Sequence, residues 1–518
     1  METRDICKFH ELCGGCLYQG VDYENQLAQK DKEIRRMLAK HKINEGIYQG
    51  MVPAFSCYGY RNKMEYTFGD FEIGGELELG MHRKRSFMSV LSTDECQIVP
   101  DQFNQVLRTT LDFCREKGYS YFHRKKHAGL LRNLVVRCGV RTNELLINIV
   151  TTTEEGFDEE GYKDMLLSQD WGEMTIVGII RTFNDSVADA VIDEGTKILY
   201  GRDYYNEKIL GLKFKVKAFA FFQTNIPAVE RLYSDALEMI PNIDNKTVYD
   251  LYCGTGTISQ LMASRAREVY GVEIVEDAVI AARANTELNG ITNCHYICGD
   301  VKEKLSELTE KPDVIVVDPP RVGMHDQVVI DLCKYAIPEF LYISCNPNTL
   351  CMNLEKFREN GYEATYLKVY DNFPMTKHAE CICRLKRLPQ YDELIAKVDS
   401  LLAGKRPIIA VCGNASAGLA AFLKNHYDCN LYNWAGPYLS NSSVWGQSSD
   451  LENDILIPTK RGKTVRYPVY SSIGTFRKYK IKDPTQLTVV EGEGFMDESL
   501  LKYYDCIIDA NDDRFEIR

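Results

Sequence analysis

The pattern of apolar and polar positions changes character several times along the chain. Residues 23–41 have a helical pattern, whereas residues 56 to about 205 contain short apolar runs, each bounded by turn residues. Runs of this kind, rich in β-branched and aromatic residues, predict strands. The clearest predicted strands span residues 63–68, 77–81, 133–138, 145–150 and 176–181. From about residue 206 to 389 strands alternate with helices, which predicts a parallel sheet with crossover helices.

These changes of pattern predict the domain organisation. We expect a cysteine-containing segment (1–55) that packs with a central β-rich domain (56–205), followed by an α/β domain (206–389). Residues 390–405 are helical and polar and are interpreted as a linker. A second α/β domain (406–518) begins with the apolar run at 408–412. A chain of 518 residues has room for three or four domains.

Two predicted strands of the α/β domain end in reactive side chains. The apolar run at 340–343 leads to Cys345 and then to a turn at Asn346-Pro347, and the run at 313–317 leads to Asp318 and Pro319-Pro320. The carboxyl ends of strands in open α/β sheets are where ligands bind. An isolated cysteine is usually a small apolar core residue. At this place in the sequence we expect Cys345 to be a functional thiol near Asp318.

A second strand-to-helix switch predicts a cofactor site. The run at 248–252 leads into Cys253-Gly254-Thr255-Gly256-Thr257, and Glu273 ends the next strand, nineteen residues after Gly254. Asp300, after the third strand, is placed to reach an adenine edge. Both a dinucleotide and S-adenosylmethionine fit such a loop. The dinucleotide motif requires a third glycine where this chain has Ser259, and Asp318-Pro319-Pro320-Arg321 has no role in hydride transfer, so S-adenosylmethionine is favoured.

Composition indicates a soluble protein of a reducing compartment. The chain has eighteen cysteines, no signal peptide and no apolar run long enough to span a membrane, so we expect a cytoplasmic location and no membrane partner. The net charge of −12 argues mildly against nucleic acid as a partner. Residues 117–143, however, hold seven Lys/Arg and no Asp/Glu, interleaved with aromatic residues. This basic run is typical of a surface that contacts phosphates and stacks on bases, or alternatively of a solvated strand face.

Five motifs occur in an order that resembles a known family. They are Phe221-Phe222-Gln223-Thr224-Asn225, Asp250-Leu251-Tyr252-Cys253-Gly254, Asp318-Pro319-Pro320-Arg321, Ser344-Cys345-Asn346-Pro347 and His378-Ala379-Glu380. Over residues 1 to about 388 the chain resembles the RNA (uracil-C5)-methyltransferase family, of the RumA/RlmD and TrmA type. The resemblance implies a class I S-adenosylmethionine-dependent methyltransferase (Rossmann-like) domain at 206–389, behind a mostly β, RNA-binding domain. It implies methylation of C5 of a uridine in RNA, with 23S rRNA as the expected substrate and tRNA as the alternative.

The resemblance also implies roles for particular residues. Cys345 becomes the nucleophile, Glu380 the general base and Phe221 an aromatic residue near the target base. The expected cofactor-binding residues are Gln223, Tyr252, Thr257, Glu273, Asp300 and Asp318, although position 257 is often Asn in the family. The chemistry requires these residue types: a thiolate adds to C6 of uracil, C5 then accepts a methyl group, and a base removes the C5 proton so that the cysteine can leave.

The N-terminal cysteines are expected to hold a metal centre. Cys7, Cys13 and Cys16 form a compact set that Cys96 could complete, and four thiolates suit either zinc or an iron–sulfur cluster. In the rRNA-modifying branch of the family the matching cysteines hold a [4Fe–4S] cluster, which the resemblance implies here, in a structural or RNA-binding role. Many members carry a small RNA-binding β barrel before these cysteines. None precedes Cys7, which increases the importance expected of the basic run.

Residues 406–518 lie outside the resemblance. The stretch 413–420 has the glycine spacing of a phosphate loop but carries Leu419 and Ala420 where Lys and Ser/Thr are needed. Residues 467–470 and 489–492 look similar to segments of uridine kinases. We therefore expect a degenerate, P-loop-like module that serves as an RNA- or nucleoside-binding appendage. The rival hypotheses for the chain are a non-catalytic RNA-binding or redox-sensing protein and an active nucleoside kinase; no obligate protein partner is inferred.

Overall fold

The computed structural model describes most of the chain. The described residues are 4–86, 88–124, 126–187, 192–308, 310–403, 405–427, 429–433, 451–470, 476–492, 495–511 and 514–518. They form two compact units. The first comprises Met1–Gly323, Glu339–Cys351 and Thr365–Arg384, and the second comprises Met324–Pro338, Met352–Ala364 and Leu385–Arg518.

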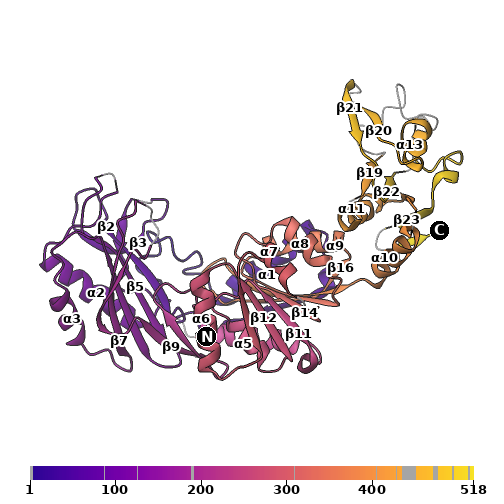
Figure 1. Cartoon of the computed structure of the whole chain (residues 1–518). Helices are drawn as coiled ribbons and strands as arrows, with labels where there is room; N and C mark the ends of the chain where they lie inside the picture. The colour runs from indigo at the N-terminus through magenta and orange to yellow at the C-terminus, as the bar shows by residue number, and fades with distance from the viewer. Residues whose placement is uncertain are drawn as a thin grey trace. The chain divides into compact units, whose positions relative to one another are not determined.

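The β-rich part of the first unit contains a sheet in the order β4-β3-β2-β5-β6-β7-β8. Neighbouring strands are antiparallel except β6 and β7. Helices α2 and α3 lie on one side of this sheet, and their apolar residues share a core with it (Figure 1). Each strand predicted for this region is confirmed. The bounds are β2 Lys63–Asp70, β3 Leu77–His82, β4 Val90–Ser92, α2 Asp101–Glu116, β5 Leu131–Gly139, β6 Glu144–Thr151, α3 Glu159–Leu167, β7 Thr175–Phe183 and β8 Thr196–Gly201.

The second sheet has the order β1-β16-β17-β15-β14-β11-β12-β13. Strands β13, β12, β11, β14 and β15 are parallel to their neighbours in this run, and the strand order reverses direction at β11 and β14. This is the doubly wound arrangement that the sequence predicted, and its reversal point is where such folds bind ligands. The strands are β1 Tyr48–Val52, β11 Thr247–Leu251, β12 Glu268–Glu273, β13 Cys294–Cys298, β14 Val314–Val317, β15 Glu339–Ser344, β16 Tyr362–Tyr370 and β17 Glu380–Arg387.

Burial explains why β14 is wholly apolar and β11 mostly so. Every residue of β11 and β14 is buried, as expected for strands covered on both faces. Helices α4, α5 and α6 contribute to the same core, together with residues of β9 and β10. The remaining elements of this region are β9 Tyr204–Ile209, β10 Leu212–Lys217, α4 Ile226–Glu238, α5 Thr257–Ala263, α6 Glu276–Leu288, α7 Val301–Lys304, α8 Asp326–Cys333 and α9 Pro347–Glu359.

The N-terminal segment contacts both sheets of the first unit. The predicted helix is present as α1, Tyr23–Lys40, and β1 pairs in parallel with β16 at the edge of the second sheet. Earlier in the segment, Cys13 forms an isolated bridge with Arg83, next to β3 of the first sheet. Residues 1–55 therefore connect the two sheets, a role that the sequence pattern did not reveal.

The second unit contains a separate five-stranded sheet, in the order β19-β22-β18-β23-β24. Its strands are parallel except β24. Helix α10 occupies most of the predicted linker, and it buries Leu394 and Val398 in the core of this unit. The elements are α10 Pro389–Leu402, β18 Ile408–Cys412, α11 Ser416–Tyr427, β19 Asn430–Asn433, α13 Ile457–Lys460, β20 Val465–Tyr470, β21 Phe476–Lys482, β22 Thr488–Glu491, β23 Cys506–Asn511 and β24 Arg514–Ile517.

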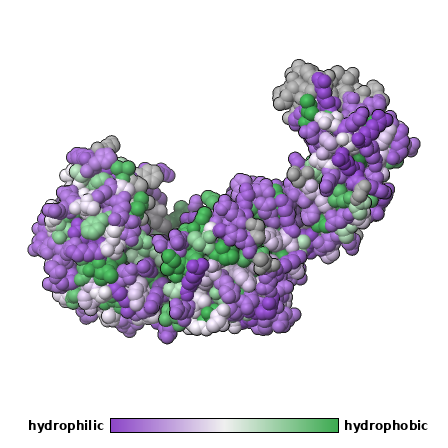
Figure 2. Space-filling model, in the orientation of Figure 1, coloured by the Kyte–Doolittle hydropathy of each residue, from purple (hydrophilic) through white to green (hydrophobic). Residues whose placement is uncertain are grey.

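The molecular surface is mainly polar. Hydrophilic residues cover most of the face shown in Figure 2, with apolar residues in smaller groups. Among the described helices, none combines the length and the apolar character needed to cross a membrane.

Candidate active site

Cys345 and Asp318 lie at the ends of adjacent parallel strands, as the sequence predicted. Strand β14 ends at Val317 and pairs in register with β15, which ends at Ser344. Glu380 is the first residue of β17, the neighbour of β15 on its other side. The sheet therefore brings together a thiol and two carboxyl groups that are separated by up to 62 residues of sequence.

Most of the surroundings of the Cys345 thiol disfavour its ionisation, and only Arg321 favours it. Burial, together with the charges of Glu380 and Asp318, raises its pKa to about 11. The positive charge of the Arg321 guanidinium opposes the rise. Arg321 belongs to one of the family motifs, but the sequence alone assigned it no role; its place two residues after Pro319 was the available signal.

The two carboxyl groups also favour their protonated forms. Burial raises the pKa of Glu380 to about 8, with a further increase from Asp318 and an opposing effect of Arg321. Burial and the charge of Asp250 raise the pKa of Asp318 to about 7. Groups whose pKa values are shifted toward neutrality are typical of proton-transfer sites.

Polar contacts hold the loops around the thiol. The Arg321 carbonyl accepts hydrogen bonds from Asn346 Nδ2 at 2.9 Å and from Thr349 Oγ1 at 3.3 Å, which joins the loops after β14 and β15. On the side of Glu380, Lys30 Nζ donates to Asp371 Oδ1 at 2.5 Å and to the His378 carbonyl at 2.9 Å. Helix α1 therefore fixes the backbone that leads into Glu380.

Gln223 is connected to the carboxyl groups through a tyrosine that the sequence did not identify. Gln223 Nε2 donates to Tyr233 Oη at 3.0 Å, and Tyr233 also interacts electrostatically with Asp318 and Glu380. Tyr233 lies on α4, where it resembles an ordinary core aromatic residue, so no sequence signal distinguished it. Phe221 lies two residues before Gln223, and its side chain is 74% exposed.

Four of the six expected cofactor residues, Tyr252, Thr257, Glu273 and Asp300, lie at or just after the carboxyl ends of β11, β12 and β13. Gly254 N–H donates to Glu273 Oε2 at 3.0 Å. The charge of Asp300 acts on Tyr252, whose pKa rises to about 12, mainly because of burial. Thr257 is buried at the first position of α5. These residues therefore share one edge of the sheet with Asp318.

The loop after β11 has an unusual backbone conformation and requires glycine at position 256. Tyr252 has a φ of 67°, in the left-handed region that is uncommon for a residue with a side chain. Gly256 has a φ of 75°, and a Cβ placed on it would lie 2.4 Å from Tyr296 Oη. Ser259, which stands where a dinucleotide motif has glycine, is buried and donates to Asp250 Oδ2.

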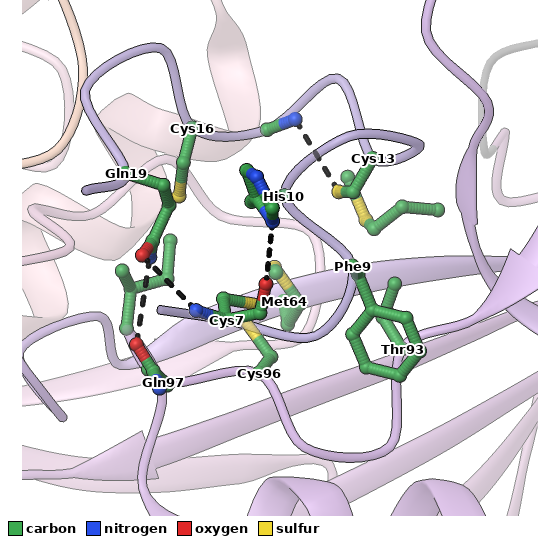
Figure 3. A pocket seen from close by; sticks show the side chains of 13 residues that line it. Cys7, Phe9, His10, Cys13, Cys16, Gln19, Met64, Thr93, Cys96 and Gln97 are labelled. Atoms are coloured by element: carbon green, nitrogen blue, oxygen red, sulfur yellow. Dashed lines mark hydrogen bonds between the residues drawn. The ribbon is translucent and has the colours of Figure 1, made fainter. Parts of the chain in front are cut away.

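The four cysteines expected to hold a metal centre line one cavity of about 40 Å³ (Figure 3). Gly15 N–H donates to Cys13 Sγ at 3.4 Å, and the backbone N–H groups of Ile98 and Val99 interact with the Cys96 sulfur. Burial raises the pKa of Cys16 to about 12 and that of Cys96 to about 11. Within the described residues, no three His, Cys, Asp or Glu side chains are arranged to hold a metal ion.

Several side chains of the basic run have partners within the protein, two of them on the surface and two of them buried. Lys117 pairs with Asp158, and Arg141 pairs with Glu230. Arg132 and Arg137 are buried and donate to main-chain carbonyl groups. Four of the seven basic side chains counted in the sequence thus have structural partners.

The doubly wound sheet, with a thiol and carboxyl groups at the carboxyl ends of its strands, defines an α/β enzyme. Comparison with known proteins gives the family. Residues 187–388 match the family model described as tRNA (Uracil-5-)-methyltransferase. A protein of Clostridium acetobutylicum named as an uncharacterized RNA methyltransferase is 45% identical over 382 residues, covering 74% of this chain and 83% of its own. A similarly named protein of Caldanaerobacter subterraneus is 44% identical, covering 74% and 85%.

A solved structure agrees with this assignment. The crystal structure of the Pyrococcus abyssi tRNA (uracil-54, C5)-methyltransferase in complex with S-adenosyl-L-homocysteine matches with a TM-score of 0.60 and 25% identity, covering 72% of this chain and 86% of that one. The chain belongs to the RNA (uracil-5-)-methyltransferase family, and the family resemblance seen in its motifs is confirmed.

Proposed function

We propose that this enzyme transfers a methyl group from S-adenosylmethionine to C5 of a uridine in 23S rRNA. The observation that carries the proposal is the convergence of Cys345, Glu380 and Arg321 at the end of β15. A nucleophile, a base and a cation that stabilises the thiolate are the groups that this reaction requires.

The methyl donor would be held by Gln223, Tyr252, Thr257, Glu273, Asp300 and Asp318. Carboxylates after the second and third strands suit the ribose and adenine of such a nucleotide-like ligand. The left-handed Tyr252 and Gly256 keep the loop backbone close to the edge of the sheet, which leaves room for the ligand. S-adenosylmethionine, when bound, supplies an electrophilic methyl group and a positive charge.

The residues of the chain perform the remaining chemistry. The Cys345 thiolate forms a bond to C6 of uracil, and the electron pair of the C5–C6 double bond makes C5 nucleophilic. After C5 has been methylated, Glu380 takes its proton, and the C6–S bond breaks to release Cys345 and restore the double bond. Phe221 is proposed to pack against the target base, which must leave its stack to enter the site.

Methyl transfer with labelled donor tests the proposal. Label should appear in 5-methyluridine of an unmodified 23S rRNA transcript, and Cys345→Ala should abolish it. Glu380→Gln should instead accumulate a covalent RNA–protein adduct on denaturing gels, because the C5 proton is retained. The matched control is Cys351→Ala, a nearby buried thiol outside the proposed chemistry. Full activity of Cys345→Ala would refute the mechanism.

We propose that Cys7, Cys13, Cys16 and Cys96 hold a [4Fe–4S] cluster. Two observations support this. The sulfurs surround a common cavity, and backbone N–H groups point toward Cys13 and Cys96, as is usual around thiolates that bind clusters. Anaerobically purified protein should contain four irons and equal sulfide, and Cys96→Ser should lose both.

The alternative substrate is tRNA, favoured by the name of the Pyrococcus relative. The two substrates are distinguished by mapping 5-methyluridine in rRNA and tRNA from cells with and without this protein. If 5-methyluridine is lost only from tRNA, then tRNA and not 23S rRNA is the substrate. The proposed chemistry is unchanged in that case.

We also propose that residues 406–518 form a degenerate, P-loop-like module and that the enzyme works in the cytoplasm. The strand order β19-β22-β18-β23 and the tight turn at Gly413 between β18 and α11 support the first proposal. Ser416 Oγ donates to Glu491 Oε1 at 2.5 Å, so a carboxylate occupies the place next to the loop where a phosphate would need positive charge. An RNA substrate and eighteen cysteines, none of them in a disulfide bond, support the cytoplasmic location. Absence of ATP hydrolysis is the expected result for the full chain.

A further inference from the structure

Positive charge in residues 406–518 is concentrated in one segment. Residues 406–518 contain thirteen Lys/Arg and fourteen Asp/Glu. Eight of the thirteen basic residues, and none of the acidic ones, fall within residues 457–482. We call this segment, as far as the structure describes it (457–470 and 476–482), the basic hairpin. It includes α13 and the antiparallel strands β20 and β21.

One face of the basic hairpin is held firmly by the rest of its unit. Val465 and Tyr467 are buried, and the Tyr467 ring packs edge-on against Tyr432 at 5.4 Å between centroids. Lys482 Nζ lies 4.5 Å from the centre of the Tyr432 ring and donates to the Leu431 carbonyl at 2.6 Å. The hairpin is thus a fixed platform.

The other face points outward. Arg466 is paired with Ile481 across the hairpin, so the two side chains share the face opposite Val465 and Tyr467. Both are exposed, Ile481 by 66%. Arg461 and Lys463 are exposed at the turn that leads into β20.

The charges of this region are crowded. The Arg406 guanidinium lies against Gly462, between Arg461 and Lys463 in sequence. Burial, together with the charges of Lys424 and Lys480, lowers the pKa of Lys482 to about 8. Lys460 is neutralised by Asp505 at 2.6 Å. Like charges held close together on a folded surface repel one another, and a polyanion relieves the repulsion.

We propose that the basic hairpin binds the sugar–phosphate backbone of the RNA substrate. This inference rests on the proposed function, because it takes RNA as the substrate. Exposed Arg and Lys beside an apolar side chain suit phosphates and the faces of sugars and bases. The need for such a surface arises from the basic run of the β-rich domain, where Arg132 and Arg137 are buried and Lys117 and Arg141 form ion pairs with carboxylates of the same chain.

Charge reversal in the full chain tests the proposal. Arg461→Glu/Lys463→Glu changes the outward charge of the basic hairpin, and Lys386→Glu/Lys397→Glu reverses two exposed lysines elsewhere in the unit. Each pair of substitutions changes the net charge from −12 to −16, because each replacement of Lys or Arg by Glu lowers the net charge by two. Binding of a fluorescent 23S rRNA transcript is measured without methyl donor from 50 to 300 mM KCl. We expect the hairpin variant to bind roughly tenfold more weakly, with a salt dependence shallower by about one to two counterions, and the control within about twofold of wild type.

Three outcomes would overturn the proposal. They are unchanged binding by the hairpin variant, equal weakening by both variants, and loss of binding to phosphatidylglycerol vesicles with RNA binding intact, which would assign the surface to membranes. If the charge-reversal variant misfolds, Arg461→Gln/Lys463→Gln replaces it, with thermal melting matched to that of wild type. The expected weakening of RNA binding is then about half as large. Failure of the proposed function looks different: wild type would bind RNA through the hairpin yet form no 5-methyluridine.

Discussion

The positive charge of Arg321 acts on the Cys345 thiol and opposes the upward shift of its pKa. The two residues follow neighbouring strands, β14 and β15, and are 24 positions apart in the sequence. Arg321 supplies the positive charge that a cysteine surrounded by two carboxyl groups needs in order to react, because only the thiolate is nucleophilic.

Arg321→Gln should slow the reaction of Cys345 with iodoacetamide. Loss of the positive charge raises the thiol pKa further, and a pKa higher by one lowers the thiolate fraction about tenfold at pH 8. Alkylation of each cysteine is followed by peptide mass spectrometry. Exposed Cys298 is the internal control, and its rate should not change. Equal rates at Cys345 in both proteins would show that Arg321 does not control the thiol.

Glu380→Gln should stabilise the protein at high pH. The pKa of Glu380 is raised from 4.5 to about 8 in the folded state, so the folded protein binds a proton that the unfolded chain releases. Stability contributed by this group is therefore lost as pH rises from about 4.5 to 8. Urea unfolding should show the variant more stable by roughly 3 kcal/mol at pH 8.5 and equal to wild type near pH 4.5. A difference independent of pH would contradict the explanation.

The raised pKa of Glu380 also predicts the pH dependence of catalysis. A general base acts only when ionised, so the step in which Glu380 removes the C5 proton should slow as pH falls below about 8. Single-turnover release of the RNA–protein adduct, measured between pH 6 and 9, should accelerate about tenfold per pH unit until that value is reached. A rate that stays flat across this interval would remove Glu380 from the role.

Asp371→Asn should destabilise the protein and misplace Glu380. Lys30 and Asp371 form an ion pair with both side chains almost fully buried, and removal of one charge leaves the other without compensation. Such changes cost about 3–5 kcal/mol. Lys30→Met combined with Asp371→Leu should recover most of the unfolding free energy. The double variant should still have reduced methyl transfer, because the hydrogen bond from Lys30 to the His378 carbonyl is absent.

Gly256→Ala should damage the cofactor loop more than a comparable change elsewhere. The new Cβ would meet Tyr296 Oη, and the backbone would keep a left-handed conformation. Gly290 has a similar φ of 65° with open space around it, so Gly290→Ala isolates the backbone cost of about 1 kcal/mol. Gly256→Ala should cost about 1–3 kcal/mol more and weaken binding of S-adenosylhomocysteine measured by calorimetry. If the two substitutions have equal effects, the ligand does not require glycine at position 256.

The sequence by itself determined the strands and the side chains at their carboxyl ends. Buried parallel strands are continuous apolar runs, and their partners in the sheet can be anticipated from the strand–helix alternation, so the positions of Asp318, Cys345 and Glu273 at one edge could be predicted. The family motifs added Gln223 and Glu380, whose roles no local pattern indicates.

Only the tertiary structure decided the electrostatics and the use of charged residues. The effect of Arg321 on Cys345, the link from Gln223 through Tyr233, and the raised pKa of Glu380 all depend on burial and on contacts between distant segments. The basic run is an equally clear case: its composition suggested an RNA surface, yet Arg132 and Arg137 are buried and bonded to carbonyl groups. Sequence specifies which charges are present, whereas their energies depend on the solvent and partners that folding assigns to them.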